Sequence, residues 1–230
     1  MPSITTSTAV EVLLKDQHCY LIRNCLSPTE QTSIYHDIQR RSKNTDNRSK
    51  PCMHPTPKTI IFDGNQSTLQ FTGGDNVYFD LIVQAANDVL KREPQLSNIF
   101  TDAAASCNST STDDTTTTLL GVGVIRYQVP NGKFPQHIDH CNDNTWVYLL
   151  SLGCSANFTI RNGHTKDERR LFQFHSGDVL VFDPSSDAAI VHGVDGINAD
   201  YDVSLDGPED FRQFRFGVQC RVRMNMNMET

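Results

Sequence analysis

Residues 211–223 read FRQFRFGVQCRVR, and from residue 214 onward apolar and polar side chains alternate. A period of two residues is typical of a β-strand, because successive side chains point to opposite faces of a sheet. One face would carry the apolar residues Phe214, Phe216, Val218, Cys220 and Val222. The other face would carry Arg215, Gly217, Gln219, Arg221 and Arg223. We therefore expect residues 211–224 to form a strand with one buried face and a row of guanidinium groups across the other.

Further short segments have the composition of strands and are separated by Gly, Pro, Asn and Asp. They are residues 9–14, 18–25, 119–127, 145–152, 156–161, 171–174, 178–182 and 188–192. Most of these strands follow two helices in the chain. This order indicates an α+β, mainly β fold, which we expect to be a jelly roll (double-stranded β-helix) or β-sandwich with the N-terminal helices packed on one face.

The first helix is expected to begin after Ser27 and to end near residue 41. Ser27 and Glu30 have the Ser-x-x-Glu spacing of a capping box, and Pro28 occupies the first helical position, where a missing N–H costs nothing. The second helix is expected over residues 78–91, where apolar side chains recur with helical spacing.

The segments between these elements are polar. Residues 42–58 contain three prolines and are expected to form an exposed loop, and residues 59–62 could add a strand. Residues 64–76 are rich in turn formers, so we expect no regular element there. Residues 103–118, AAASCNSTSTDDTTTT, are too polar to pack in a core and are interpreted as a disordered, low-complexity insertion.

A length of 230 residues suits one domain, which we expect to span residues 1–230. Residues 1–100 would supply strands, helices and candidate substrate-recognition loops, and residues 119–224 the jelly-roll core. No apolar run reaches the roughly 18 residues of a membrane span, and the N-terminus has no signal-peptide pattern. The seven cysteines include no C-x-x-C pair. We expect an intracellular protein of the nucleus or cytoplasm, not secreted, not bound to a membrane, and monomeric.

Three residues could bind one metal ion. His137 and Asp139 flank Ile138 just after the turn-like residues 130–132, and residues two apart in an extended segment point to the same side. His192 ends the apolar run of residues 188–191. Two histidines and one carboxylate form the facial triad of Fe(II) oxygenases. The alternative is a chance H-x-D triplet, because the chain has 8 His and 27 acidic residues.

The guanidinium face of residues 211–223 also has two interpretations. An arginine inside a barrel mouth needs an anion, and a dicarboxylate could supply one through a bidentate pair. Alternatively, the segment is an edge strand whose charges prevent aggregation. Among other candidates, Trp146 is expected to pack in the core, His175 to be an exposed loop residue, and His140 to point away from Asp139.

Five short motifs, in order along the chain, resemble the AlkB-like branch of the Fe(II)/2-oxoglutarate-dependent dioxygenases. They are YQVPNG (127–132) before the H-x-D motif, SLG (151–153) with Ala156 and Phe158, SGDVLVF (176–182), HGV (192–194), and the pair Arg215 and Arg221. The resemblance covers nearly half of the chain. It departs from the family pattern at Ile125, where the family often has Asn, and at Gly217 and Gln219, where the family has Asn and Ser or Thr.

This resemblance implies roles for individual residues. The ligands of Fe(II) would be His137, Asp139 and His192. Arg215 would pair with the distal carboxylate of 2-oxoglutarate, Tyr127 would hydrogen-bond the same cosubstrate, and Arg221 would lie between the metal and the substrate. The reaction would consume O2, convert 2-oxoglutarate to succinate and hydroxylate a C–H bond. On an N-methyl group, the hydroxylated product loses formaldehyde.

Three functions remain open on the sequence. The first is oxidative demethylation of alkylated bases in DNA or RNA, with residues 42–76 gripping a flipped base and basic clusters at residues 40–50 and 161–170 touching phosphates. The second is the same chemistry on a protein side chain or small molecule, which the net charge of -7 favours. The third is a non-catalytic binding module on a jelly-roll scaffold.

Overall fold

The computed structural model describes residues 8–43, 66–71, 77–96, 100, 118–139, 144–165, 169–201 and 207–223. Their elements, in chain order, are β1 (Ala9–Leu14), β2 (Cys19–Arg23), α1 (Pro28–Lys43), β3 (Gln66–Phe71), α2 (Val77–Leu90), β4 (Thr118–Gln128), β5 (Phe134–His137), β6 (Thr145–Gly153), β7 (Ala156–Asn162), β8 (Arg170–Phe174), β9 (Val179–Phe182), β10 (Ile190–Ile197), the short 3-10 helix Glu209–Arg212, and β11 (Phe214–Arg223).

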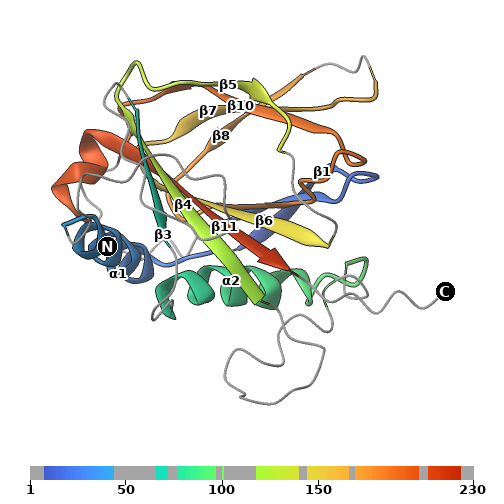
Figure 1. Ribbon diagram of the computed structural model, residues 1–230, viewed down its shortest axis with the longest axis horizontal. Coiled ribbons are helices and arrows are strands. Elements are labelled where there is room, and N and C mark those ends of the chain that lie inside the picture. Colours follow the sequence, from blue (N-terminus) through green and yellow to red (C-terminus); the bar gives the residue numbers. More distant parts are fainter. Residues whose placement is uncertain are drawn as a thin grey trace, which may run out of the picture.

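The strands form two antiparallel sheets that face each other (Figure 1). The larger sheet has the order β1-β2-β9-β6-β11-β4-β3, and the smaller has the order β5-β10-β7-β8. Helices α1 and α2 cover the face of the larger sheet that points away from the smaller one (Figure 1). The fold is therefore mainly β, of the jelly-roll type with helices on one face, as the element order predicted.

Strand β11 lies inside the larger sheet, between β6 and β4. The edge-strand interpretation of this segment is therefore wrong. Its two faces divide as the period of two predicted: Val218, Cys220 and Val222 are buried in the core under the helices, whereas Arg215 lies on the opposite face. Trp146 on β6 packs in the same helix-side core, as predicted.

A second apolar core fills the space between the sheets. The larger sheet contributes Leu21, Tyr127, Val147, Leu180 and Phe182, and the smaller sheet contributes Phe158, Ile160, Phe174, Ile190 and Val194. This inner core supports the polar site described below, because the site residues project from the same two faces.

The N-terminus of α1 has the predicted capping box. The backbone N–H of Ser27 donates to Glu30 Oε2 at 2.7 Å, and the backbone N–H of Glu30 lies 3.4 Å from Ser27 Oγ. The helix runs slightly past the expected end at residue 41. Within the described residues, no helix is long and apolar enough to cross a membrane.

The structure differs from the sequence prediction in several elements. Phe134–His137 was not among the expected strands, yet it forms β5, and the strand expected from residue 211 begins only at Phe214, because Glu209–Arg212 forms a 3-10 helix. Gln66–Phe71 lies in the stretch expected to be turn-rich, yet it forms β3 and pairs with β4 along six residues. Long-range pairing here overrides a weak local pattern. Strand β10 begins at Ile190 and continues to Ile197, beyond the predicted segment 188–192. The predicted strand at 59–62 and most of the segments 42–58 and 103–118 lie outside the described residues.

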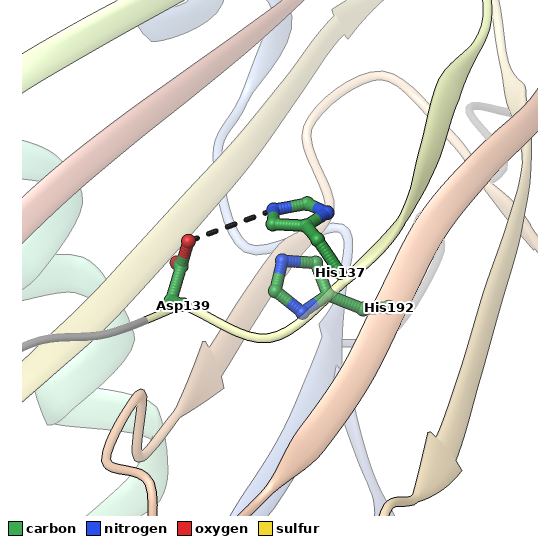
Figure 2. Close-up of side chains that lie close together, drawn as sticks. All are labelled: His137, Asp139 and His192. Atoms are coloured by element: carbon green, nitrogen blue, oxygen red, sulfur yellow. Dashed lines mark ion pairs between the residues drawn. The ribbon is translucent and has the colours of Figure 1, made fainter.

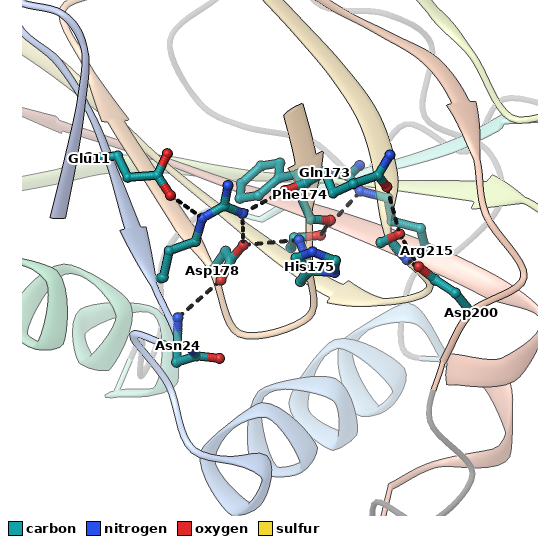
Figure 3. A network of polar contacts seen from close by, with 11 residues as sticks. Glu11, Asn24, Gln173, Phe174, His175, Asp178, Asp200 and Arg215 are labelled. Atoms are coloured by element: carbon teal, nitrogen blue, oxygen red, sulfur yellow. Dashed lines mark hydrogen bonds and ion pairs between the residues drawn. The ribbon is translucent and has the colours of Figure 1, made fainter. Parts of the chain in front are cut away.

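A polar network ties β2 to the turn that precedes β9 (Figure 3). Asp178, which is 1% exposed, accepts hydrogen bonds from the backbone N–H of Asn24 and of His175, both at 3.0 Å. Its Oδ2 also accepts from Arg23 Nη1 at 2.8 Å, and Arg23 Nε donates to Glu11 at 2.7 Å. Both oxygens of the buried carboxylate are thus used.

Asp178→Asn should lower the free energy of unfolding by about 1–3 kcal/mol, because the amide replaces one acceptor oxygen with a donor and leaves a buried N–H without a partner. Urea denaturation of the variant and wild type measures the difference. The control is Asp187→Asn, at an exposed carboxylate, which should change stability by less than about 0.5 kcal/mol. Equal losses in both variants would contradict the role assigned to Asp178.

Candidate metal centre

The two histidines of the predicted triad face each other across neighbouring strands. His137 ends β5 and pairs directly with His192 on β10, and their ring centroids lie 4.3 Å apart. Asp139 follows two residues after β5. The three side chains offer ligand atoms that all lie within 4.8 Å of one another, and Figure 2 shows the carboxylate next to the His137 ring. The structure therefore brings the predicted triad together.

The backbone fixes which nitrogen each imidazole presents. His137 Nδ1 lies 3.0 Å from the carbonyl oxygen of Pro135, and His192 Nδ1 lies 3.2 Å from that of Ile190. A carbonyl can only accept, so each Nδ1 carries the proton and each Nε2 keeps its lone pair. Neutral imidazoles whose other N–H is held by a carbonyl are the usual form of histidine ligands.

Packing holds the inner histidine rigidly. His192 is 5% exposed and stacks on Phe158 with ring centroids 6.0 Å apart, and Phe182 lies 5.0 Å away. The His137 side chain is 33% exposed at the rim. Its strand β5 is a short edge strand with only two positions paired to β10, and the Gln136 side chain donates a hydrogen bond to Thr159 Oγ1 on β7.

The charges of the triad are arranged for cation binding. Burial and the nearby His137 lower the pKa of His192 to about 4. Burial opposes ionisation of Asp139, yet its hydrogen bond with His137 and the charges of His192 and Arg221 lower its pKa overall. For His137, burial lowers the pKa, but the hydrogen bonds that the protonated ring donates to Asp139 and to the Pro135 carbonyl outweigh it, so the pKa is raised.

Arg215 lies between the two sheets, as the strand pattern predicted. The side chain is 1% exposed, and its Nε donates to Ser151 Oγ at 3.2 Å. The guanidinium lies 5.0 Å from the centroid of the Tyr127 ring and 5.3 Å from that of Phe174. Phe174 in turn packs on Phe158. Arg215 and the triad therefore lie in the same space between the sheets, and the rings of Phe174 and Phe158 connect Arg215 to His192.

The Arg215 guanidinium has unused hydrogen-bonding capacity. Among the described residues, its Nη2 is the buried side-chain polar atom that has no hydrogen-bond partner. Burial lowers the pKa of Arg215 and raises that of Tyr127, where the charge of Arg215 opposes the shift. A buried cation without an anion is costly. The site therefore fits a ligand that brings a carboxylate to this position.

The sequence reasoning missed two contacts that support the site. Gln219 Nε2 donates to Asp139 Oδ2 at 2.8 Å, and Ser151 accepts from Arg215. The period of two had placed Gln219 on the same face as Arg215, and this pattern could have indicated that Gln219 lies at the site. Arg221 lies on this face too, exposed, and its charge acts on Asp139. His164 and His175 are exposed, whereas His140 lies outside the described residues.

A family model described as the 2OG-Fe(II) oxygenase superfamily matches residues 18–226. The chain belongs to this superfamily. The oxygenase therefore uses Fe(II), 2-oxoglutarate and O2, and the donor set of two imidazoles, one carboxylate and a buried arginine fits those groups. The expectation of an enzyme is confirmed, and the non-catalytic binding module is set aside.

Solved structures show the same fold at low sequence identity. The structure titled OsALKBH1 is 16% identical to this oxygenase, covers 93% of this chain and 99% of its own, and has a TM-score of 0.61. A prolyl hydroxylase from Trichoplax adhaerens, in complex with a hypoxia-inducible-factor peptide, is 12% identical over 94% and 89%, with a TM-score of 0.54. The viral collagen prolyl hydroxylase of Paramecium Bursaria Chlorella virus-1 is 12% identical over 97% and 100%, with a TM-score of 0.50. A search of curated proteins finds no match.

The shifted pKa values give an expected pH dependence for metal binding. An imidazole must be neutral to bind a metal, so protons compete with it. His137, whose pKa is raised, takes up its proton first as the pH falls, whereas His192 stays neutral down to a pH of about 4. Below the pKa of His137, Co(II) affinity of the iron-free enzyme should fall about tenfold per pH unit, the slope for one proton. Co(II) titrations between pH 5 and 8 measure this slope, and a two-proton slope would contradict the assignment.

Proposed function

We propose that this oxygenase removes N-alkyl groups from bases in nucleic acid, either DNA or RNA. The observation that carries the proposal is an open space on the inner face of the larger sheet, beside the metal centre. Among the residues that the structure describes, a Cβ atom placed on Gly123 of β4 would meet no atom within 4 Å. Gly123 pairs directly with Gln219, whose amide holds Asp139. A flat ring placed against Gly123 would therefore lie next to a metal ligand.

In this proposal, the residues of the chain have separate tasks. The Nε2 atoms of His137 and His192 and the carboxylate of Asp139 would hold Fe(II). Arg215 would pair its free Nη2 with the distal carboxylate of 2-oxoglutarate, with Tyr127 beside it. The bound iron and its cosubstrates supply the oxidation of a C–H bond while 2-oxoglutarate is converted to succinate and CO2. A hydroxylated N-methyl carbon then leaves as formaldehyde.

Arg221 would act at the substrate side of the site. It is exposed, lies on the same face of β11 as Gln219, and pairs with Gly121 of β4. An exposed guanidinium at this position can contact a phosphate or the face of a base. The TM-score of 0.61 to OsALKBH1, against 0.54 and 0.50 to the two prolyl hydroxylases, also supports the proposal.

A second candidate is oxidation of a protein side chain. The net charge of -7 opposes binding to a polyanion, and two of the structures with this fold are prolyl hydroxylases by title. The same metal centre would serve that reaction. The two candidates differ in the group that occupies the space beside Gly123. Only an experiment that compares substrates can therefore distinguish them, because the chemistry at the iron is the same in both.

The test is 2-oxoglutarate turnover with Fe(II) and ascorbate in the presence of single-stranded oligonucleotides that carry or lack an N-methylated base. We expect formaldehyde only with the methylated strand, and a Michaelis constant that rises with salt because phosphate contacts release counterions. The His137→Ala variant, which is expected to be inactive, serves as the negative control. Turnover that responds to peptides and not to methylated oligonucleotides would overturn the proposal and support the second candidate.

A further inference from the structure

Gln219 makes a one-sided contact with the metal centre. Its Nε2 donates to Oδ2 of Asp139 at 2.8 Å, whereas Oδ1 of the same carboxylate lies 3.5 Å from Nε2 of His137. The amide thus engages one carboxylate oxygen and leaves the other on the side of the imidazoles. This arrangement presents a single oxygen of Asp139 to the position between the histidines.

The contact also fixes the orientation of the amide. A carboxylate that serves as a metal ligand can only accept hydrogen bonds, so Gln219 must turn its NH2 group toward Asp139. The carbonyl Oε1 then points away from the carboxylate. Within the part of the chain that the structure describes, Oε1 has no hydrogen-bond donor, and the Gln219 side chain is partly exposed. An acceptor without a donor among the described residues is therefore left beside the metal centre.

The neighbouring strands leave room on one side of Gln219. On β6 its paired residue is Leu149, which is partly buried against the inner core. On β4 its paired residue is Gly123, where a Cβ atom would meet no atom of the described residues within 4 Å. A group placed beside Gly123 would therefore lie next to Gln219, which in turn contacts Asp139.

We infer that Gln219 links the metal centre to the substrate: its N–H holds Asp139 in place, and its Oε1 accepts a hydrogen bond from an N–H of the base, next to the alkylated ring nitrogen. The second role rests on the proposed function. The hydrogen bond to Oε1 selects bases that carry an exocyclic amine next to the alkylated ring nitrogen. A carbonyl there would face Oε1, and two opposed acceptors disfavour binding.

The role toward the metal is tested without any substrate. Gln219→Met keeps the length and volume of the side chain but has no N–H to donate. Loss of a partner that orients a metal ligand typically weakens binding by about 10–100-fold, so the Co(II) dissociation constant should rise at least about tenfold. The control Gln128→Met, at an exposed position of β4, should bind Co(II) as the wild type does. Equal Co(II) affinity in Gln219→Met and the wild type, with both folded by circular dichroism, would overturn this role.

The role toward the substrate is tested with two oligonucleotides that differ at one group. 3-Methylcytosine carries an exocyclic amine next to the N-methyl group, and 3-methyluracil carries a carbonyl there. We expect the wild type to prefer 3-methylcytosine by about 10-fold or more in kcat/KM. Because 3-methylcytosine is also cationic, the informative quantity is the change of this ratio on mutation. Gln219→Met should move the ratio at least about fivefold toward one, the low end for an unmade hydrogen bond.

A third variant separates the two roles. Gly123→Leu would fill the space at this position while keeping Gln219 and all three metal ligands, so it should lower kcat/KM for both oligonucleotides at least about tenfold while Co(II) affinity stays the same. An unchanged substrate ratio in Gln219→Met would overturn the substrate role and leave the proposed function standing. If the wild type oxidises neither oligonucleotide, the proposed function and the substrate role fall together, and the Co(II) titration decides the metal role by itself.

Discussion

His137→Ala should reduce the conversion of 2-oxoglutarate to succinate to the background rate while the protein stays folded. The variant loses one of the three side chains that converge on the metal position. The His137 side chain is 33% exposed at the rim, so it contributes little to packing. We expect the free energy of unfolding to change by less than about 1 kcal/mol. Succinate production and urea denaturation measure the two effects.

Two further variants make this result specific. His175→Ala, at an exposed loop position, should leave turnover and stability unchanged. His192→Ala should also abolish turnover but at a cost in stability, because that ring is buried against Phe158 and Phe182. Turnover in His137→Ala at more than a tenth of the wild-type rate would show that the residue is not a ligand.

Arg215→Lys should weaken 2-oxoglutarate binding by roughly one to two orders of magnitude, or about 1.5–3 kcal/mol for a charge-assisted hydrogen bond. Lysine keeps the charge but loses the planar fork that matches a carboxylate. It also leaves Ser151 Oγ without the donor that now lies 3.2 Å away. Titration of 2-oxoglutarate against the Co(II)-loaded protein gives the two dissociation constants.

Arg221→Lys is the matched comparison for that experiment. Arg221 is exposed and acts on Asp139 from the substrate side, so we expect its replacement to disturb substrate oxidation more than cosubstrate binding. Equal affinity for 2-oxoglutarate in the wild type and Arg215→Lys would show that another cation binds the cosubstrate.

The sequence was informative where local rules decide the structure. The period of two in residues 214–223 correctly divided β11 into a helix-side face and a site-side face, because a strand alternates its side chains whatever surrounds it. The capping box of Ser27 and Glu30 depends on four adjacent residues and was also predicted correctly. The H-x-D spacing identified two members of the triad for the same reason.

Contacts between distant parts of the chain could not be predicted in this way. β3 exists because β4 offers a pairing edge, and its own sequence shows little sign of it. For Gln219, the sequence indicated only a departure from the AlkB-like pattern that the chain resembles. Its hydrogen bond to Asp139, 80 positions away, depends on how β11 lies beside the segment after β5.

The short edge strand β5 has a thermodynamic consequence. One histidine of the triad lies on this strand, which has only two positions paired with β10, and the other lies on β10 itself. An ion bound by both side chains adds its binding free energy to the docking of β5, since ligands on separate strands can meet only when the strands are joined. Iron binding and the docking of β5 on β10 are then thermodynamically linked. The backbone amides of β5 would therefore exchange with solvent faster in the iron-free enzyme than in the iron-loaded one.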